Sequence, residues 1–184
     1  MKRTALIGSG NAFFRDEGAG LYAAKYLKEN CDFAPEVEIV DGGTLGFRLM
    51  PLLQEFDSVV IANTASDDTA AAGEVFVRGC DDFLEESRIR KTANEVEIAE
   101  MLQVCTLSGN MADVTIVSIV PEDIVSVEVG LTPAVTSAWD AYIGRIVETL
   151  AAGGVTCKKR PGGPDLDAVL AIFAEPSIEH NRGF

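Results

Sequence analysis

The chain has 184 residues, a length typical of one domain, and 47% of them are hydrophobic, so we expect one folded core rather than a disordered chain. Fifteen Lys and Arg residues against 29 Asp and Glu residues leave a formal net charge of −14. This charge repels a phosphate backbone or an anionic bilayer, which argues against nucleic acid as a partner.

No segment is typical of a membrane span or of an export signal. The longest run without a charged residue, 101–112, is shorter than the about 20 residues that a membrane helix requires. The basic start is followed by an apolar stretch that Gly8, Gly10 and Arg15 interrupt. We therefore expect a cytoplasmic protein that does not insert into a membrane.

The cysteines and the single histidine do not form a zinc signature. His180 lies near the end of the chain, and the cysteines are far apart, with no C-x-x-C pair; they are Cys31, Cys80, Cys105 and Cys157. We expect free, mostly buried thiols.

Strands and helices alternate in the first third of the sequence. Apolar runs predict strands over 3–8, 36–40 and 57–62, and helical spacing of apolar residues predicts helices over 18–28 and 45–54. Such alternation is typical of a parallel sheet with helical crossovers.

The same alternation continues to about residue 155. A short strand is predicted over 73–77, a surface helix over 92–107, the strongest strand over 113–120 and an amphipathic helix over 135–150. The predicted fold class is α/β, a three-layer α/β/α sandwich with a largely parallel sheet, formed by a single domain of residues 1–155.

The composition changes after this domain. Residues 158–164 (KKRPGGP) resemble a solvated hinge, and 165–174 has the pattern of a short helix. We expect residues 156–184 to be a C-terminal extension made of a hinge and this helix.

Two common chemistries do not fit. Gly8-Ser9-Gly10 follows the first strand, but the dinucleotide fingerprint requires glycine where the sequence has Phe13. A nucleophilic hydrolase would require a motif such as G-x-S-x-G and a histidine as the base. This sequence has no such motif, and no histidine lies within its folded body. A nucleotide-binding protein remains a third hypothesis, which tight binding of an adenylate or a flavin would support.

Polar residues follow each of the first three predicted strands. They are Asn11, Asp16 and Glu17 after the first strand, 41–44 (DGGT) after the second, and Asn63 and Thr64 after the third. Taken singly, each group is explained by helix capping or by a turn. Together they predict a ligand site at the carboxyl edge of the sheet, where open α/β sheets bind their ligands.

Five segments together resemble the nickel-iron hydrogenase maturation endopeptidases. They are ALIGSGNAFFRDEGAG at 5–20, VDGGTLG at 40–46, VVIANTA at 59–65, IVPE at 119–122 and GLTPAV at 130–135. The resemblance spans about residues 3 to 155 and implies an α/β/α sandwich. It also implies a hydrolase that removes a short C-terminal peptide from a hydrogenase large-subunit precursor after nickel loading, with nickel carried by that partner rather than bound permanently.

The resemblance implies three metal ligands, of which this chain keeps one. The family's Glu corresponds to Glu17, whereas its Asp and His correspond to Asn63 and Asn94. An Asn amide is a neutral, weak oxygen ligand for nickel.

This departure leaves three alternatives open. Neighbouring acids could substitute, namely Asp16, Asp67, Asp68 or Glu95. His180 could fold back from the tail. Alternatively, the protein is a catalytically degenerate homologue that binds the hydrogenase precursor without cleaving it.

If the protein is a metal-dependent endopeptidase, the resemblance gives its residues roles. Glu17 would occupy a vacant position on the substrate's nickel and place the scissile peptide over the turn made by Gly42, Gly43 and Thr44. Asp41 could orient or deprotonate the attacking water, and the glycines would let the substrate backbone approach closely.

Overall fold

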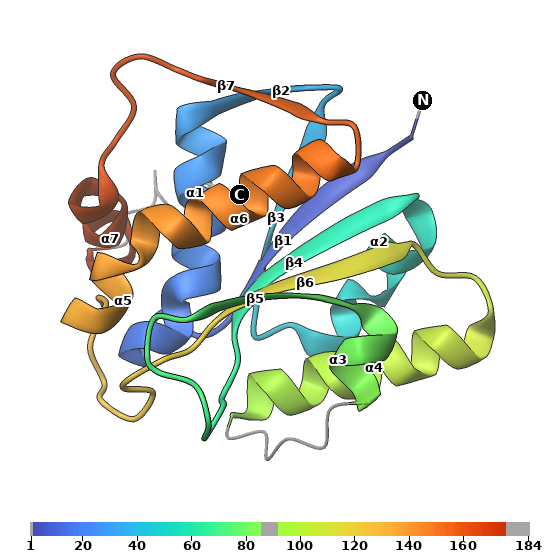
Figure 1. Ribbon diagram of the computed structural model, residues 1–184, viewed down its shortest axis with the longest axis horizontal. Helices are drawn as coiled ribbons and strands as arrows, with labels where there is room; N and C mark the ends of the chain where they lie inside the picture. The colour runs from blue at the N-terminus through green and yellow to red at the C-terminus, as the bar shows by residue number, and fades with distance from the viewer. Residues whose placement is uncertain (1, 86–91, 176–184) are drawn as a thin grey trace.

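The structure, a computed structural model that describes residues 2–85 and 92–175, is built on a five-stranded sheet (Figure 1). The strands run in the order β3-β1-β4-β6-β5. Their bounds are β1 (Thr4–Ser9), β3 (Val37–Gly43), β4 (Ser58–Thr64), β5 (Val75–Gly79) and β6 (Asp113–Ile119). All neighbours are parallel except β5, which pairs antiparallel with β6.

Helices cover both faces of this sheet, as Figure 1 shows. One face carries α1 (Ala19–Asn30), α5 (Pro133–Ser137), α6 (Trp139–Ala152) and α7 (Leu166–Ala174). The other carries α2 (Met50–Glu55), α3 (Cys80–Glu85) and α4 (Ala93–Ser108), with the short helix η2 (Gly46–Leu49) before α2. The predicted α/β/α sandwich with a largely parallel sheet is confirmed.

Each face of the sheet has its own hydrophobic core. Leu6 and Tyr22 belong to the core under α1 and α6, whereas Ile7 and Leu102 belong to the core under α2 and α4. Because β4 is central, all seven of its residues are buried, which explains why its sequence is a continuous apolar run rather than an alternating one.

The segment after residue 155 packs onto the domain. Lys158 and Lys159 are exposed, as predicted for a solvated segment, but they belong to a strand rather than to a hinge. Strand β7 (Thr156–Lys159) pairs antiparallel with β2 (Cys31–Ala34), a strand that the sequence did not predict. An isolated pair of strands with mostly exposed side chains lacks a clear apolar alternation. Strand β7 is therefore held by backbone hydrogen bonds, which cannot be predicted from its amino-acid composition.

The predicted helix over 165–174 is present as α7 and joins the core beside α1. Val169 is fully buried, and the ring of Phe173 packs edge-on against that of Tyr22 at 5.0 Å between centroids. Residues 176–184, including His180, lie outside the described part of the chain.

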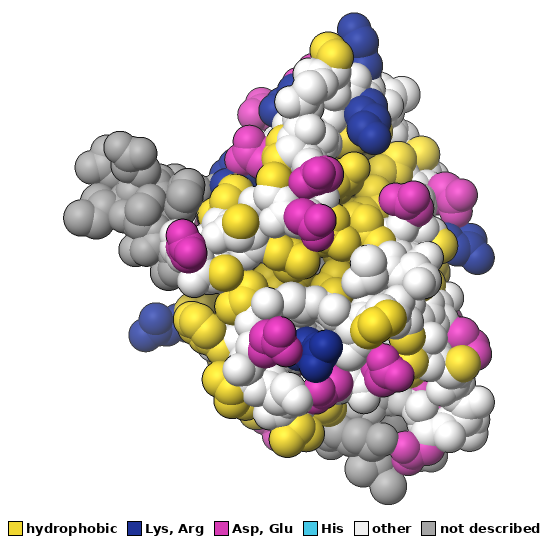
Figure 2. Space-filling model, turned by 90° about the vertical axis from the view of Figure 1, so that its left-hand side faces the viewer, with side chains coloured by type: hydrophobic (Ala, Val, Ile, Leu, Met, Phe, Trp, Pro, Cys, Tyr) yellow, Lys and Arg dark blue, Asp and Glu magenta, His cyan; other side chains and the backbone are white. Residues whose placement is uncertain are grey.

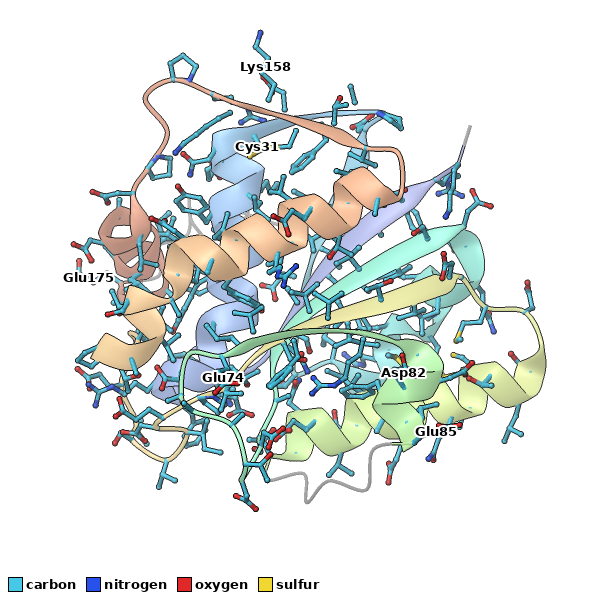
Figure 3. The ribbon with its side chains drawn as sticks, in the orientation of Figure 1. Cys31, Glu74, Asp82, Glu85, Lys158 and Glu175 are labelled. Atoms are coloured by element: carbon cyan, nitrogen blue, oxygen red, sulfur yellow. The ribbon has the colours of Figure 1, made fainter. Side chains whose placement is uncertain are left out.

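The four cysteines are free, as expected, and two of them are buried. Figure 3 shows Cys31 beneath the β2–β7 pair, on the side opposite to the exposed Lys158. Burial is the main cause that raises the pKa of Cys31 to about 12, so this thiol stays protonated near neutral pH. In the described part of the chain, no helix has the length and apolar character needed to cross a bilayer.

Helix α1 crosses the sheet so closely that Gly20 tolerates no side chain. A Cβ at Gly20 would collide with the backbone oxygens of Ala62 and Ser9, which belong to β4 and β1. We expect Gly20→Ala to lower the free energy of unfolding by about 3 kcal/mol, since neither strand can move aside without strain. Urea denaturation followed by circular dichroism measures this loss.

Gly144 in α6 provides the matched control. A Cβ there meets no atom within 4 Å, so Gly144→Ala should raise the free energy of unfolding by up to about 1 kcal/mol through helix propensity. Equal effects of the two substitutions would contradict the close crossing of α1.

Candidate functional site

Glu17 lies in the short helix η1 (Arg15–Gly18), which connects the end of β1 to α1. The conformation of Gly10 makes this arrangement possible, because its φ of +143° and the closeness of the Glu17 carbonyl leave no room for a Cβ. The Asn11 N–H donates to that carbonyl at 3.2 Å. The glycine and asparagine after β1 thus fix the backbone of Glu17.

The same loop is fastened from the side of α1. The Tyr22 hydroxyl donates to the carbonyl oxygen of Ala12 at 2.8 Å, next to Asn11.

A cavity of about 300 Å³ opens beside Glu17 at the carboxyl edge of the sheet. Its walls come from the loop after β1, the turn after β3, the start of α4 and the loop after β6. The lining residues are Asn11, Phe14, Glu17, Thr44, Thr92, Ala93, Asn94, Glu97, Ile124 and Val125. We call this cavity the Glu17 pocket.

Exposed hydrophobic side chains lie on the loop after β1, in η2 and on the loop after β6, next to elements that line the Glu17 pocket. Phe13, Phe47 and Val125 are 59%, 44% and 79% exposed. Hydrophobic side chains also reach the surface elsewhere, as Figure 2 shows for the face seen from the left of Figure 1, where they form a band with acidic side chains beside it.

Burial controls the electrostatics of Glu17, whose side chain is only slightly exposed. Desolvation raises the pKa of Glu17 above its usual value, a hydrogen bond with the Thr92 side chain lowers it, and the nearby Glu95 carboxylate raises it. A cation beside Glu17 would favour the charged carboxylate and so lower this pKa.

Asn94 lies in the first turn of α4, where Thr92 and Glu95 form a capping box. Its Nδ2 donates to Ser9 Oγ at 3.0 Å and to the carbonyl oxygen of Gly43 at 3.2 Å. Asn94 therefore joins the ends of β1 and β3, and its amide is engaged within the protein.

Asn63 is near the end of β4 and is fully buried. Its Oδ1 accepts a hydrogen bond from Ser118 Oγ on β6 at 2.7 Å, while its Nδ2 has no hydrogen-bond partner. Asn63 does not line the Glu17 pocket. The structure thus places Asn94 at the pocket together with Glu17, whereas Asn63 is buried near the end of β4 and does not line the pocket.

The acids considered as substitutes have other partners. Asp16 accepts four hydrogen bonds from residues 122–132. Glu95 accepts from the N–H and hydroxyl of Ser66, both at 2.8 Å. Asp67 accepts from the N–H and hydroxyl of Thr69, and Asp68 is exposed.

Over residues 2–85 and 92–175, no three His, Cys, Asp or Glu side chains come together as a metal site. The described residues therefore offer no complete ligand set for a metal ion held by this chain alone.

Asp41 is half-buried near the end of β3, and burial raises its pKa, with a hydrogen bond from the Gly43 backbone acting in the opposite direction. A Cβ at the next residue, Gly42, would meet Leu49 on the α2 side, so Asp41 faces the α1 side. Of the predicted turn, Thr44 lines the Glu17 pocket, whereas Asp41, Gly42 and Gly43 do not.

Sequence reasoning missed Glu97 and Thr92 as pocket residues. Glu97 lies three residues after Asn94 in α4, so the two share one helix face. That spacing was the available signal, but it identifies a pocket residue only when the site of Asn94 is already known.

The fold and the pocket define the class: an α/β/α protein with a pocket at the carboxyl edge of a largely parallel sheet and one buried carboxylate in that pocket. The family model described as hydrogenase maturation protease matches residues 21–149, a range that includes Asn63 and Asn94 and begins after Glu17. The chain belongs to the hydrogenase maturation protease family.

Curated relatives agree with this membership. A hydrogenase 2 maturation protease of Escherichia coli (strain K12) is 24% identical over 83% of this chain and 93% of its own length. A hydrogenase expression/formation protein of Rhodobacter capsulatus is 25% identical over 86% of this chain and 76% of its own length.

The solved structures share the fold. The hydrogenase maturating endopeptidase of E. coli superposes with a TM-score of 0.79 at 24% identity, covering 86% of this chain and 98% of that one. A [NiFe] hydrogenase maturation protease of Thermococcus kodakarensis gives a TM-score of 0.65 at 24% identity, covering 81% and 99%.

Proposed function

We propose that this protein removes a C-terminal peptide from the large subunit of a nickel-iron hydrogenase in the cytoplasm, after nickel has been loaded. The observation that carries the proposal is the Glu17 carboxylate, which lines a pocket at the carboxyl edge of the sheet. Membership of the maturation protease family supports it.

In this proposal the nickel belongs to the substrate. The large subunit holds the metal with its own ligands, and Glu17 occupies one vacant position on it. One carboxylate is sufficient for this role, which agrees with a pocket that offers no complete ligand set among the described residues. Binding in this way fixes the tail of the precursor relative to the protease, and such positioning lowers the barrier to cleavage.

Asp41 is the group that we propose to orient the attacking water and accept its proton. A carboxylate whose pKa is raised by burial is better matched to this task than one with an ordinary pKa. Since Asp41 lies outside the Glu17 pocket, the scissile peptide has to cross the turn of Gly42 and Gly43 to reach it.

The test is incubation of the purified protein with a purified precursor in its nickel-loaded and nickel-free forms. We expect mass spectrometry to show loss of a C-terminal peptide from the nickel-loaded form only. A stable complex with no mass loss would contradict the proposal and favour the alternative, a homologue that binds the precursor without cleaving it. Cleavage of both forms would contradict the role of nickel.

A further inference from the structure

The buried carboxylate of Asp16 connects segments that are far apart in the sequence. Its Oδ2 accepts from the backbone N–H groups of Glu122 and Asp123 and from the Thr132 hydroxyl, each at 2.9 Å. Its Oδ1 accepts from the Thr132 N–H at 2.7 Å. Asp16 is fully buried. Its four bonds therefore tie η1 to both ends of the loop between β6 and α5.

That loop, residues 120–132, supplies one wall of the Glu17 pocket through Ile124 and Val125. Backbone bonds add to the attachment, since the Arg15 N–H donates to Glu128 at 2.9 Å and the Glu128 N–H donates to Phe13 at 3.0 Å. Asp16 also directly precedes Glu17. The Asp16 side chain thus fixes both the helix η1, which contains Glu17, and the pocket wall that the loop 120–132 supplies.

Only a carboxylate satisfies this arrangement. All four groups that face Asp16 are donors, and an ionised carboxylate is a side chain with acceptors alone. An amide of the same shape would direct its own NH2 group at a donor and leave buried N–H groups without partners.

We propose that Asp16 is a positioning residue that holds the loop 120–132 against η1 and so sets the geometry between Glu17 and the opposite wall of the pocket. Asp16 acts through these contacts and does not touch the substrate. The inference rests on the proposed function only for its activity measurement.

The test compares Asp16→Asn with Asp113→Asn. Asp113 is the matched control because it is exposed at the start of β6, at the opposite end of the sheet from the pocket, and the charge change is the same. We expect Asp16→Asn to increase amide hydrogen exchange at Glu122 and Thr132 by about tenfold or more, because bonds to a charged acceptor are lost. It should also shift the 13C resonance of the Glu17 carboxyl group.

Asp113→Asn should leave the exchange at Thr132 and the Glu17 resonance unchanged. Unchanged exchange and an unchanged Glu17 resonance in Asp16→Asn would overturn the proposal. Equal effects of both substitutions would overturn it as well, since a general charge effect would then explain them. These measurements do not use cleavage, so they remain decisive if the proposed function fails.

Activity separates positioning from stability alone. At a temperature where Asp16→Asn is fully folded, we expect its kcat/KM for peptide release, per folded molecule, to fall by about tenfold or more. A value equal to that of the wild type would mean that Asp16 only stabilises the fold, and the proposal would be withdrawn.

Thr132 provides a second pair of variants if Asp16→Asn does not fold. Thr132→Val removes one of the four bonds, whereas Thr132→Ser keeps the hydroxyl group that donates to Asp16. We expect faster exchange at Glu122 and Asp123 in the valine variant and wild-type exchange in the serine variant. Identical exchange in the two variants would overturn the proposal.

Discussion

Glu17→Gln is expected to abolish release of the C-terminal peptide from a nickel-loaded hydrogenase precursor. The substitution keeps the shape of the side chain but replaces a charged ligand by a neutral amide, which binds nickel weakly. We expect kcat/KM to fall by about a hundredfold or more, which corresponds to about 2.7 kcal/mol of lost transition-state stabilisation. Single-turnover cleavage followed by mass spectrometry measures the rate.

Glu148→Gln is the control for this substitution. Glu148 is exposed on α6, where it forms an ion pair with Arg145, and it does not line the Glu17 pocket. Its substitution therefore removes the same charge away from that pocket. Its rate should equal that of the wild type. Unchanged cleavage by Glu17→Gln would remove the metal-binding role of Glu17 but would leave the family membership and the fold untouched.

The double variant Asn63→Asp, Asn94→His is expected to bind free Ni²⁺, whereas the wild type is not. It adds a carboxylate and an imidazole, both strong nickel ligands, at the two positions where the family resemblance places them. We expect its affinity to exceed that of the wild type by at least about a hundredfold, or about 2.7 kcal/mol. Isothermal titration calorimetry measures both proteins directly.

A second double variant, Asn94→His with Asn110→Asp, distinguishes the effect of a carboxylate at position 63 from the effect of the added charge alone. Asn110 is exposed in the loop after α4, so this protein has the same composition change without a carboxylate on β4. Its affinity should fall below that of the first double variant. Saturable binding of Ni²⁺ by the wild type would show that amide oxygens suffice and would contradict our account of the ligand set.

The parts of the fold that the sequence predicts are those with strong hydrophobic patterns. The central strands β4 and β6 are apolar runs buried on both faces, and α6 places Trp139, Tyr142 and Ile146 on one buried side. By contrast, β2 and β7 are four residues each and mostly exposed, so their pairing depends on contacts distant in sequence.

The candidate site follows the same rule. That Glu17 lies at the carboxyl edge of the sheet follows from strand order, and the structure brings it together with Asn94 and Thr44. The hydrogen bond between Asn63 and Ser118 was not predictable, because it joins neighbouring strands whose residues are 55 positions apart along the chain. The role of Asp16 depends on Thr132, which is 116 residues away along the chain.

The aromatic contact between Phe173 and Tyr22 connects the segment after residue 155 to the loop after β1. Because the hydroxyl of the same tyrosine donates to the carbonyl oxygen of Ala12, α7 supports the loop that contributes Asn11 and Phe14 to the Glu17 pocket. A protein shortened at residue 155 would keep every strand of the central sheet, but it would lose the contact between Phe173 and Tyr22 that supports this loop.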